Sequence, residues 1–142
     1  MKKIIAGVFT LLTLLSTSPL LAAGPDIPSL KGVWTVNTEG SIMIWDEKPG
    51  KNTHWEDKQT TLTAEIDITA QNGRVLSAVF KSDKATERLI GVIGHDNVSL
   101  YLADTDGIVD GKIIDPDTIE VVYRHVTPKD TVVTVGFFKR KK

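Results

Sequence analysis

Apolar and polar residues alternate with a period of two along short stretches of the chain. The clearest stretch is residues 55–69, in which threonines and acidic residues separate the apolar positions Leu62, Ala64, Ile66 and Ile68. This alternation is typical of β-strands with one buried face. No stretch shows the 3.6-residue apolar period and the capping residues of a helix. We therefore expect an all-β protein.

Turn sequences divide the chain into eight such stretches. Asn72-Gly73 has the composition of a tight hairpin turn, and Asp115-Pro116-Asp117 contains a proline that presets φ. The expected strands span residues 32–45, 55–69, 74–82, 87–95, 98–102, 108–114, 118–125 and 131–139. Eight strands joined by short hairpins form an antiparallel meander, which closes most simply into an up-and-down β-barrel. A β-sandwich is the alternative.

The meander also predicts which loops lie together, because alternate turns fall at opposite ends of a barrel. The turns near Asn72, Asp96 and Pro116 belong to one end. The other end carries four segments, which are residues 46–54, 83–86, 104–107 and 127–130. The first of these is the longest loop, so we expect the open mouth there. Barrels of eight strands are wide enough for one small ligand, and their mouths are preferred binding positions.

The N-terminus has the pattern of an export signal. Two lysines precede an apolar run from Ile4 to Leu15, and small residues end the segment at Ala22-Ala23. An uncleaved membrane anchor is the alternative, although interrupting polar residues make a poor spanning helix. We expect a signal peptide over residues 1–23, an extended lead-in over 24–30 and one domain over 31–142. The expected location is periplasmic or secreted, with no membrane span after cleavage.

Composition narrows the class of protein further. The chain has 142 residues and no cysteine, so it is expected to contain no disulfide and not to be a lipoprotein. It has 17 basic and 18 acidic residues, and loss of Lys2 and Lys3 with the signal leaves the remainder slightly more acidic. This balance argues against nucleic acid as a partner. The oligomeric state is left open.

The first strand opens with Gly32-Val33-Trp34, and this Gly-x-Trp resembles the start of calycin barrels, which include lipocalins and avidins. The resemblance implies that Trp34 packs across the closed end beneath a basic residue of the last strands, either Lys139 or Arg140, with Arg124 less favoured. Residues 62–80 resemble the second and third strands of avidins. Phe80 and Val92 stand where avidins carry a ligand-bonding Tyr and a pocket Trp. The resemblance therefore implies the fold and not biotin binding.

Aromatic and polar residues near the expected mouth are the candidates for ligand binding. Trp45 and Trp55 flank the long loop, where they form either an aromatic clamp over the mouth or a cross-strand pair that stabilises the hairpin. Tyr123 shares a face with Ile119 and Val121, so its hydroxyl should point inward. The expected ligand-binding residues are Trp45, His54, Trp55, Phe80, Arg88 and Tyr123, with His54 or Arg88 as the polar anchor.

Signals for metals and catalysis are weak, and we expect no cofactor, no metal and no catalytic residue. His54 and His125 could share the mouth with Glu56 or Asp104 in a two-histidine metal site. Residues 104–110 resemble a fragment of a calcium loop that lacks its closing Glu. The terminal residues 139–142 are basic and could touch anionic lipid, although a solvated strand end explains them as well.

These observations favour a non-enzymatic, exported binding protein that holds a small, mostly apolar ligand at the open end of the barrel. In that case small inward residues such as Ala64, Ala78 and Gly91 should leave space inside. The alternative is a protein-interaction module, for example an inhibitor of an exported enzyme that acts through the 46–54 loop. A hydrolase using His54 is a third possibility, but no spacing places a nucleophile or a base.

Overall fold

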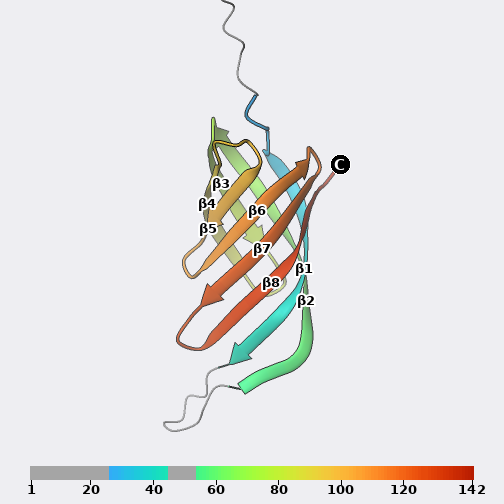
Figure 1. Cartoon of the computed structure of the whole chain (residues 1–142), viewed down its shortest axis with the longest axis vertical. Helices are drawn as coiled ribbons and strands as arrows, with labels where there is room; N and C mark the ends of the chain where they lie inside the picture. The colour runs from blue at the N-terminus through green and yellow to red at the C-terminus, as the bar shows by residue number, and fades with distance from the viewer. Residues whose placement is uncertain (1–25, 45–53) are drawn as a thin grey trace, which may run out of the picture.

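Eight antiparallel strands form a closed barrel in which consecutive strands pair and the last strand pairs with the first (Figure 1). The computed structural model describes the backbone of residues 26–44 and 54–142, and the side chains of 26–43 and 61–142. The predicted up-and-down barrel is confirmed, and the β-sandwich alternative is wrong. The strands are β1 (Gly32–Ile44), β2 (His54–Asn72), β3 (Val75–Lys81), β4 (Thr86–Ile93), β5 (Ser99–Ala103), β6 (Gly107–Asp115), β7 (Thr118–Val126) and β8 (Asp130–Arg140).

The hairpin at Asn72-Gly73 forms as its sequence predicts, and Gly73 has the positive φ of 56° that such a turn needs. The strand before it, β2, extends to Asn72, whereas the alternation pattern ends at Thr69. The reason is a register shift between Ile68 and Ala70, where β2 pairs with β3. A bulge of this kind breaks the period of two, so the pattern ends before the strand does.

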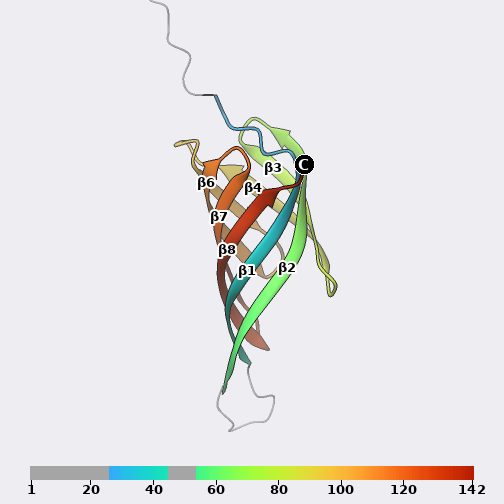
Figure 2. The ribbon, with the colours of Figure 1, turned by 90° about the vertical axis from the view of Figure 1, so that its right-hand side faces the viewer.

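The two ends of the barrel differ in what covers them. One end carries the turns at residues 73–74, 94–98 and 116–117, together with residues 26–31 and the C-terminus (Figures 1 and 2). We call it the closed end. The opposite end carries the turns at residues 82–85, 104–106 and 127–129. We call it the open end. Among residues 26–44 and 54–142, no helix is long and apolar enough to cross a membrane.

Residues 26–31 plug the closed end by means of hydrogen bonds that tie them to the barrel. Leu30 is 1% exposed, and its N–H donates to Gln71 Oε1 at 2.8 Å. The Gln71 amide in turn donates to the Pro28 carbonyl at 2.9 Å. The indole of Trp34 is fully buried and donates to the Leu30 carbonyl at 2.9 Å. The core therefore begins at this end with its polar groups satisfied.

A cation covers Trp34 from the side of the last strand. The Arg140 guanidinium carbon lies 4.2 Å from the centroid of the Trp34 ring. Arg140 also donates to the carbonyls of Ser29, Lys31 and Pro116 at 2.9 to 3.0 Å. Of the basic residues considered for this position, Arg140 makes the contact. Arg124 instead pairs with Asp110.

Strands β1 and β8 approach closely where the barrel closes. A Cβ on Gly136 would lie 2.0 Å from the Asn37 carbonyl oxygen, and one on Gly40 would lie 2.1 Å from that of Val133. Both distances are far below van der Waals contact, so only glycine fits at either position. Gly40 pairs with Thr134, and Gly136 pairs with Thr38. The seam therefore places two inward threonines opposite glycines.

Candidate functional site

A cavity of about 380 Å³ occupies the open half of the barrel. Core packing usually leaves only voids near the size of a water molecule, so a space this large is a distinct feature of the interior. Its volume lies in the range of small-molecule pockets, which is about 300–1,000 Å³. Apolar side chains supply most of its wall, and they are Val36, Leu62, Ile66, Phe80, Ala85, Leu89, Val109, Val121, Val132 and Phe138.

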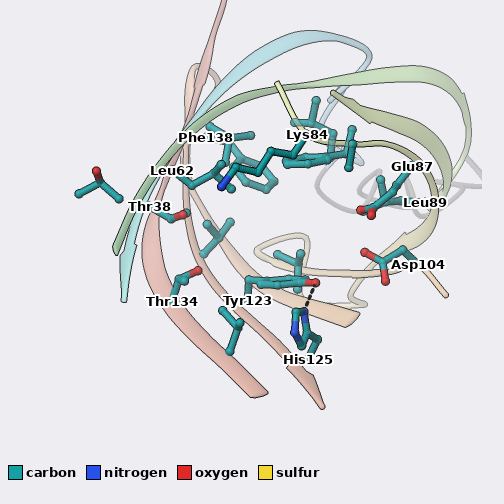
Figure 3. A pocket seen from close by; sticks show the side chains of 18 residues that line it. Thr38, Leu62, Lys84, Glu87, Leu89, Asp104, Tyr123, His125, Thr134 and Phe138 are labelled. Carbon is teal, nitrogen blue, oxygen red and sulfur yellow. Dashed lines mark hydrogen bonds between the residues drawn. The ribbon is translucent and has the colours of Figure 1, made fainter. Parts of the chain in front are cut away.

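Polar groups gather on part of the cavity wall. Figure 3 shows Glu87 and Asp104 on one side, with Tyr123 and His125 below them in that view. Lys84 reaches over the cavity from the turn between β3 and β4 (Figure 3). An apolar cavity with a few convergent polar groups is the usual form of a binding site.

Tyr123, His125 and Asp130 form a continuous chain of hydrogen bonds. The Tyr123 hydroxyl lies 2.9 Å from His125 Nδ1, and His125 Nε2 lies 3.0 Å from Asp130 Oδ1. The Thr127 hydroxyl donates to the same carboxylate oxygen at 2.7 Å. This hydrogen bond is the main cause that lowers the pKa of Asp130, and the hydrogen bond with His125 adds to it.

This chain fixes the direction of its hydrogen bonds. An ionised Asp130 can only accept, so His125 Nε2 carries the proton that it donates to Asp130. In the neutral imidazole His125 Nδ1 is then the acceptor, and the Tyr123 hydroxyl donates to it. The proton of Tyr123 is thus engaged, and its oxygen keeps lone pairs for a ligand. The two rings lie edge to face, with centroids 5.6 Å apart.

Burial and nearby negative charge both raise the pKa values of two side chains at the mouth of the cavity, Tyr123 and Glu87. Burial raises the pKa of Tyr123, and the carboxylates of Asp104 and Asp106 raise it further. The same causes, in the same order, raise the pKa of Glu87, while His125 partly opposes them. Tyr123 therefore remains a neutral phenol at physiological pH, suited to hydrogen bonding and not to acting as a base.

Gly107 leaves the room in which Tyr123 lies. A Cβ at this position would stand 2.4 Å from Tyr123 Cε2 and 2.5 Å from its hydroxyl oxygen. Glycine at the start of β6 thus allows the ring to pass directly over the backbone. The sequence pattern predicted Gly107 only as part of the turn at residues 104–107.

Thr38 places a buried hydroxyl on the cavity wall. Thr38 is 8% exposed, and its side chain points into the cavity (Figure 3). Within residues 26–43 and 61–142, no group forms a hydrogen bond with Thr38 Oγ1. A buried hydroxyl without a partner is unusual, since most such atoms are paired.

Two of the residues expected to bind ligand line the cavity. Phe80 projects from β3 and Tyr123 from β7, and both face inward as the alternation of their strands predicts. Arg88 does not line the cavity, because Leu89 takes the inward position and alternation turns Arg88 outward. The neighbouring carboxylate of Glu87 reaches the cavity instead.

The remaining expected site residues lie beyond the described side chains. Trp45 and residues 46–53 of the long loop are outside the described residues, as is the expected signal peptide over residues 1–23. His54 and Trp55 are described only as backbone at the start of β2, where they pair with Ile44 and Met43. The aromatic clamp, the histidine anchor and the insertion of the 46–54 loop into a partner therefore remain predictions.

The cavity does not arise where small inward residues suggested. Ala64 and Ala78 face the interior but belong to the packed core, and they do not line the cavity. Gly91 leaves no space, because a Cβ there would lie 2.3 Å from a methyl group of Leu102.

The described residues show no arrangement suited to a metal ion. Among the side chains of residues 26–43 and 61–142, no group of three His, Asp or Glu residues could hold one. Asp104 Oδ1 accepts hydrogen bonds from the N–H groups of Asp106 and Gly107, so it shapes its own turn. His54 and Glu56, which the two-histidine hypothesis needs, have no described side chains.

No protein-family model and no curated protein matches the chain. Among solved structures, the chain is similar to a redesigned beta barrel with 10% sequence identity and a TM-score of 0.45. The similarity covers 80% of this chain and 92% of that one.

Proposed function

We propose that this chain is an exported, non-enzymatic binding protein that holds one small, mostly apolar molecule in the cavity of its barrel. The cavity is the observation that carries the proposal. Export and a periplasmic or secreted location depend on the pattern of residues 1–23. Calycin-like ancestry stays a resemblance based on the Gly-x-Trp of the first strand.

Three properties of the cavity support binding. Its volume is sufficient for a small ligand, its wall is mainly apolar, and its polar groups converge at one mouth. The free energy of binding would come from apolar surface removed from water, at about 25 cal/mol per Å². The fixed Tyr123–His125–Asp130 chain needs no rearrangement to meet a ligand, which lowers the entropic cost of binding.

The proposal is tested with the neutral fluorescent probe N-phenyl-1-naphthylamine and two neighbouring valines of β8. Val132 lines the cavity, whereas Val133 points outward and is 48% exposed. Val132→Phe should fill the mouth and weaken probe binding at least tenfold, and Val133→Phe should leave it unchanged. Circular dichroism and thermal melting verify that both variants fold. Equal binding by the two variants would contradict the proposal.

Native mass spectrometry of protein from its own source adds a second measurement. A small mass that is lost on denaturation would identify the class of ligand. Absence of that mass, together with no binding of the neutral probe, would reject the proposal.

A further inference from the structure

The hydroxyl of Thr38 lies on the cavity wall and has no hydrogen-bond partner among the described side chains, which are those of residues 26–43 and 61–142. Trp34, Val36 and Thr38 occupy successive inward positions of β1, so Thr38 is the first polar residue on that face above the core. Its cross-strand neighbours are Leu62 and Gly136. Neither side chain can form a hydrogen bond, so the ladder leaves Thr38 Oγ1 with nothing beside it to bond.

A second threonine is buried to the same extent as Thr38, but its hydroxyl has a hydrogen-bond partner. Thr118 is also 8% exposed, but it lies at the start of β7 toward the closed end. Its hydroxyl accepts a hydrogen bond from Lys139 Nζ at 2.9 Å. The difference between Thr38 and Thr118 is therefore the presence of a partner, not the depth of burial.

The charges around the mouth limit which polar ligands can enter. Glu87 and Asp104 line the cavity, and Asp106 and Asp130 lie in the adjacent turn and strand. After burial, which is the largest cause, the carboxylates of Asp104 and Asp106 raise the pKa values of Glu87 and Tyr123, as a negative local potential does. Lys84 is the only lysine or arginine among the lining residues that the structure describes, and it is exposed. A carboxylate ligand would thus meet repulsion.

We propose that the cavity selects an uncharged molecule that carries a hydroxyl or carbonyl group on an apolar body, and that Thr38 is the residue that binds this group. This inference rests on the proposed function, because it specifies the ligand class of the same cavity. Thr38 acts as a specificity-determining residue: a ligand without the polar group leaves its buried hydroxyl unpaired. Acidic molecules are disfavoured by Glu87 and Asp104.

Three eight-carbon compounds separate these effects. 1-Octanol, n-octane and octanoate have matched chains and differ in their end group, and each is measured by displacement of N-phenyl-1-naphthylamine at pH 7. The wild-type protein should prefer 1-octanol to n-octane by about tenfold beyond their difference in hydrophobicity, since one satisfied hydrogen bond is worth that much. Octanoate should bind more weakly than 1-octanol.

Thr38→Val keeps the shape of the side chain and removes its hydroxyl. This variant should lose the preference for 1-octanol while it binds n-octane at least as well as the wild type. Without ligand it should be as stable as the wild type or more stable, because none of the described side chains forms a hydrogen bond with the Thr38 hydroxyl. The matched control Thr118→Val should lose stability and keep the 1-octanol preference.

Other outcomes would overturn the inference in distinguishable ways. If the preference for 1-octanol survives in Thr38→Val, Thr38 does not bind the polar group. If octanoate binds best and Lys84→Ala abolishes its binding, the ligand class is acidic. If neither 1-octanol nor n-octane displaces the probe from the wild type, the proposed function fails together with this inference.

Discussion

The guanidinium of Arg140 stacks over the ring of Trp34 at 4.2 Å and ties the end of β8 to the chain segment that plugs the barrel. Its nitrogens reach three backbone carbonyls, and they also form an ion pair with Asp117 at 3.2 Å. A planar, five-donor group makes these contacts together, and an ammonium group cannot. The stability of the closed end therefore depends on the identity of this cation and not only on its charge.

Arg140→Lys should accordingly lower the free energy of unfolding by about 2 kcal/mol, since it loses the stacking and at least one hydrogen bond. Urea unfolding measures this effect. Lys142→Ala is the control, because the side chain of Lys142 is 86% exposed and its ion pair with Asp117 contributes little. Equal stability of Arg140→Lys and the wild type would show that charge alone is sufficient.

Gly107→Ala should disturb the Tyr123–His125 hydrogen bond. The added methyl group would fall within 2.7 Å of three atoms of Tyr123, so the ring must move toward the cavity. We expect a loss of about 1–3 kcal/mol in the free energy of unfolding, as for other overpacked sites. In a Tyr123→Ala background the same substitution should cost much less, and a double-mutant cycle by urea unfolding measures the difference. Additive effects would contradict the clash.

Asp130→Asn should destabilise the protein most near neutral pH. The hydrogen bonds from Thr127 and His125 lower the pKa of Asp130, so its contribution is present above the unfolded value of about 3.9 and is lost as pH falls through the folded value. The variant and the wild type should therefore converge in stability at acidic pH. Thermal melts from pH 2 to 8 measure this. Asp83→Asn, an exposed carboxylate at the same end, should have little effect at any pH.

Glu87→Gln should show the opposite dependence on pH. Burial, followed by Asp104 and Asp106, raises the pKa of Glu87, so its contribution is fully present below the unfolded value of about 4.3 and is lost as pH rises through the folded value. The variant should be more stable than the wild type at pH 7, and the difference should disappear in acid. The same melts decide this, and a variant less stable at pH 7 would show that the Glu87 carboxylate is stabilising.

The architecture follows from local patterns that are readable in the sequence. Period-two alternation identified the strands, and turn residues such as Asn72-Gly73 identified the hairpins, because both depend on neighbouring residues alone. The meander then placed His125 at the open end, where it lines the cavity. Bulges were missed, since the register shift in β2 depends on pairing with β3 and not on the sequence of β2 alone.

The site was predicted only in part. Tyr123 and Phe80 could be placed by alternation. Arg88 was expected to serve as a polar anchor at the mouth, but it does not line the cavity, and its neighbour Leu89 faces inward. Tyr123 bonds to His125 within β7, and His125 bonds to Asp130 across the turn to β8. Both hydrogen bonds depend on side-chain conformations, which the alternation of apolar and polar residues does not predict. Thr38 did carry a readable signal, because it continues the inward series of Trp34 and Val36.

The pairing of β1 with β8 has a consequence for how the protein is made. Arg140 reaches the Lys31 carbonyl across 109 positions of sequence, and Val132, Thr134 and Phe138 of β8 complete the cavity wall. Contacts between chain ends are entropically costly to close and form slowly. A nascent chain thus has no enclosed cavity until its final strand has been synthesised and has docked. A chain shortened before Asp130 would leave the edges of β1 and β7 unpaired and open to aggregation. It would also lack the part of the cavity wall that β8 supplies, so only molecules with a closed barrel would hold ligand.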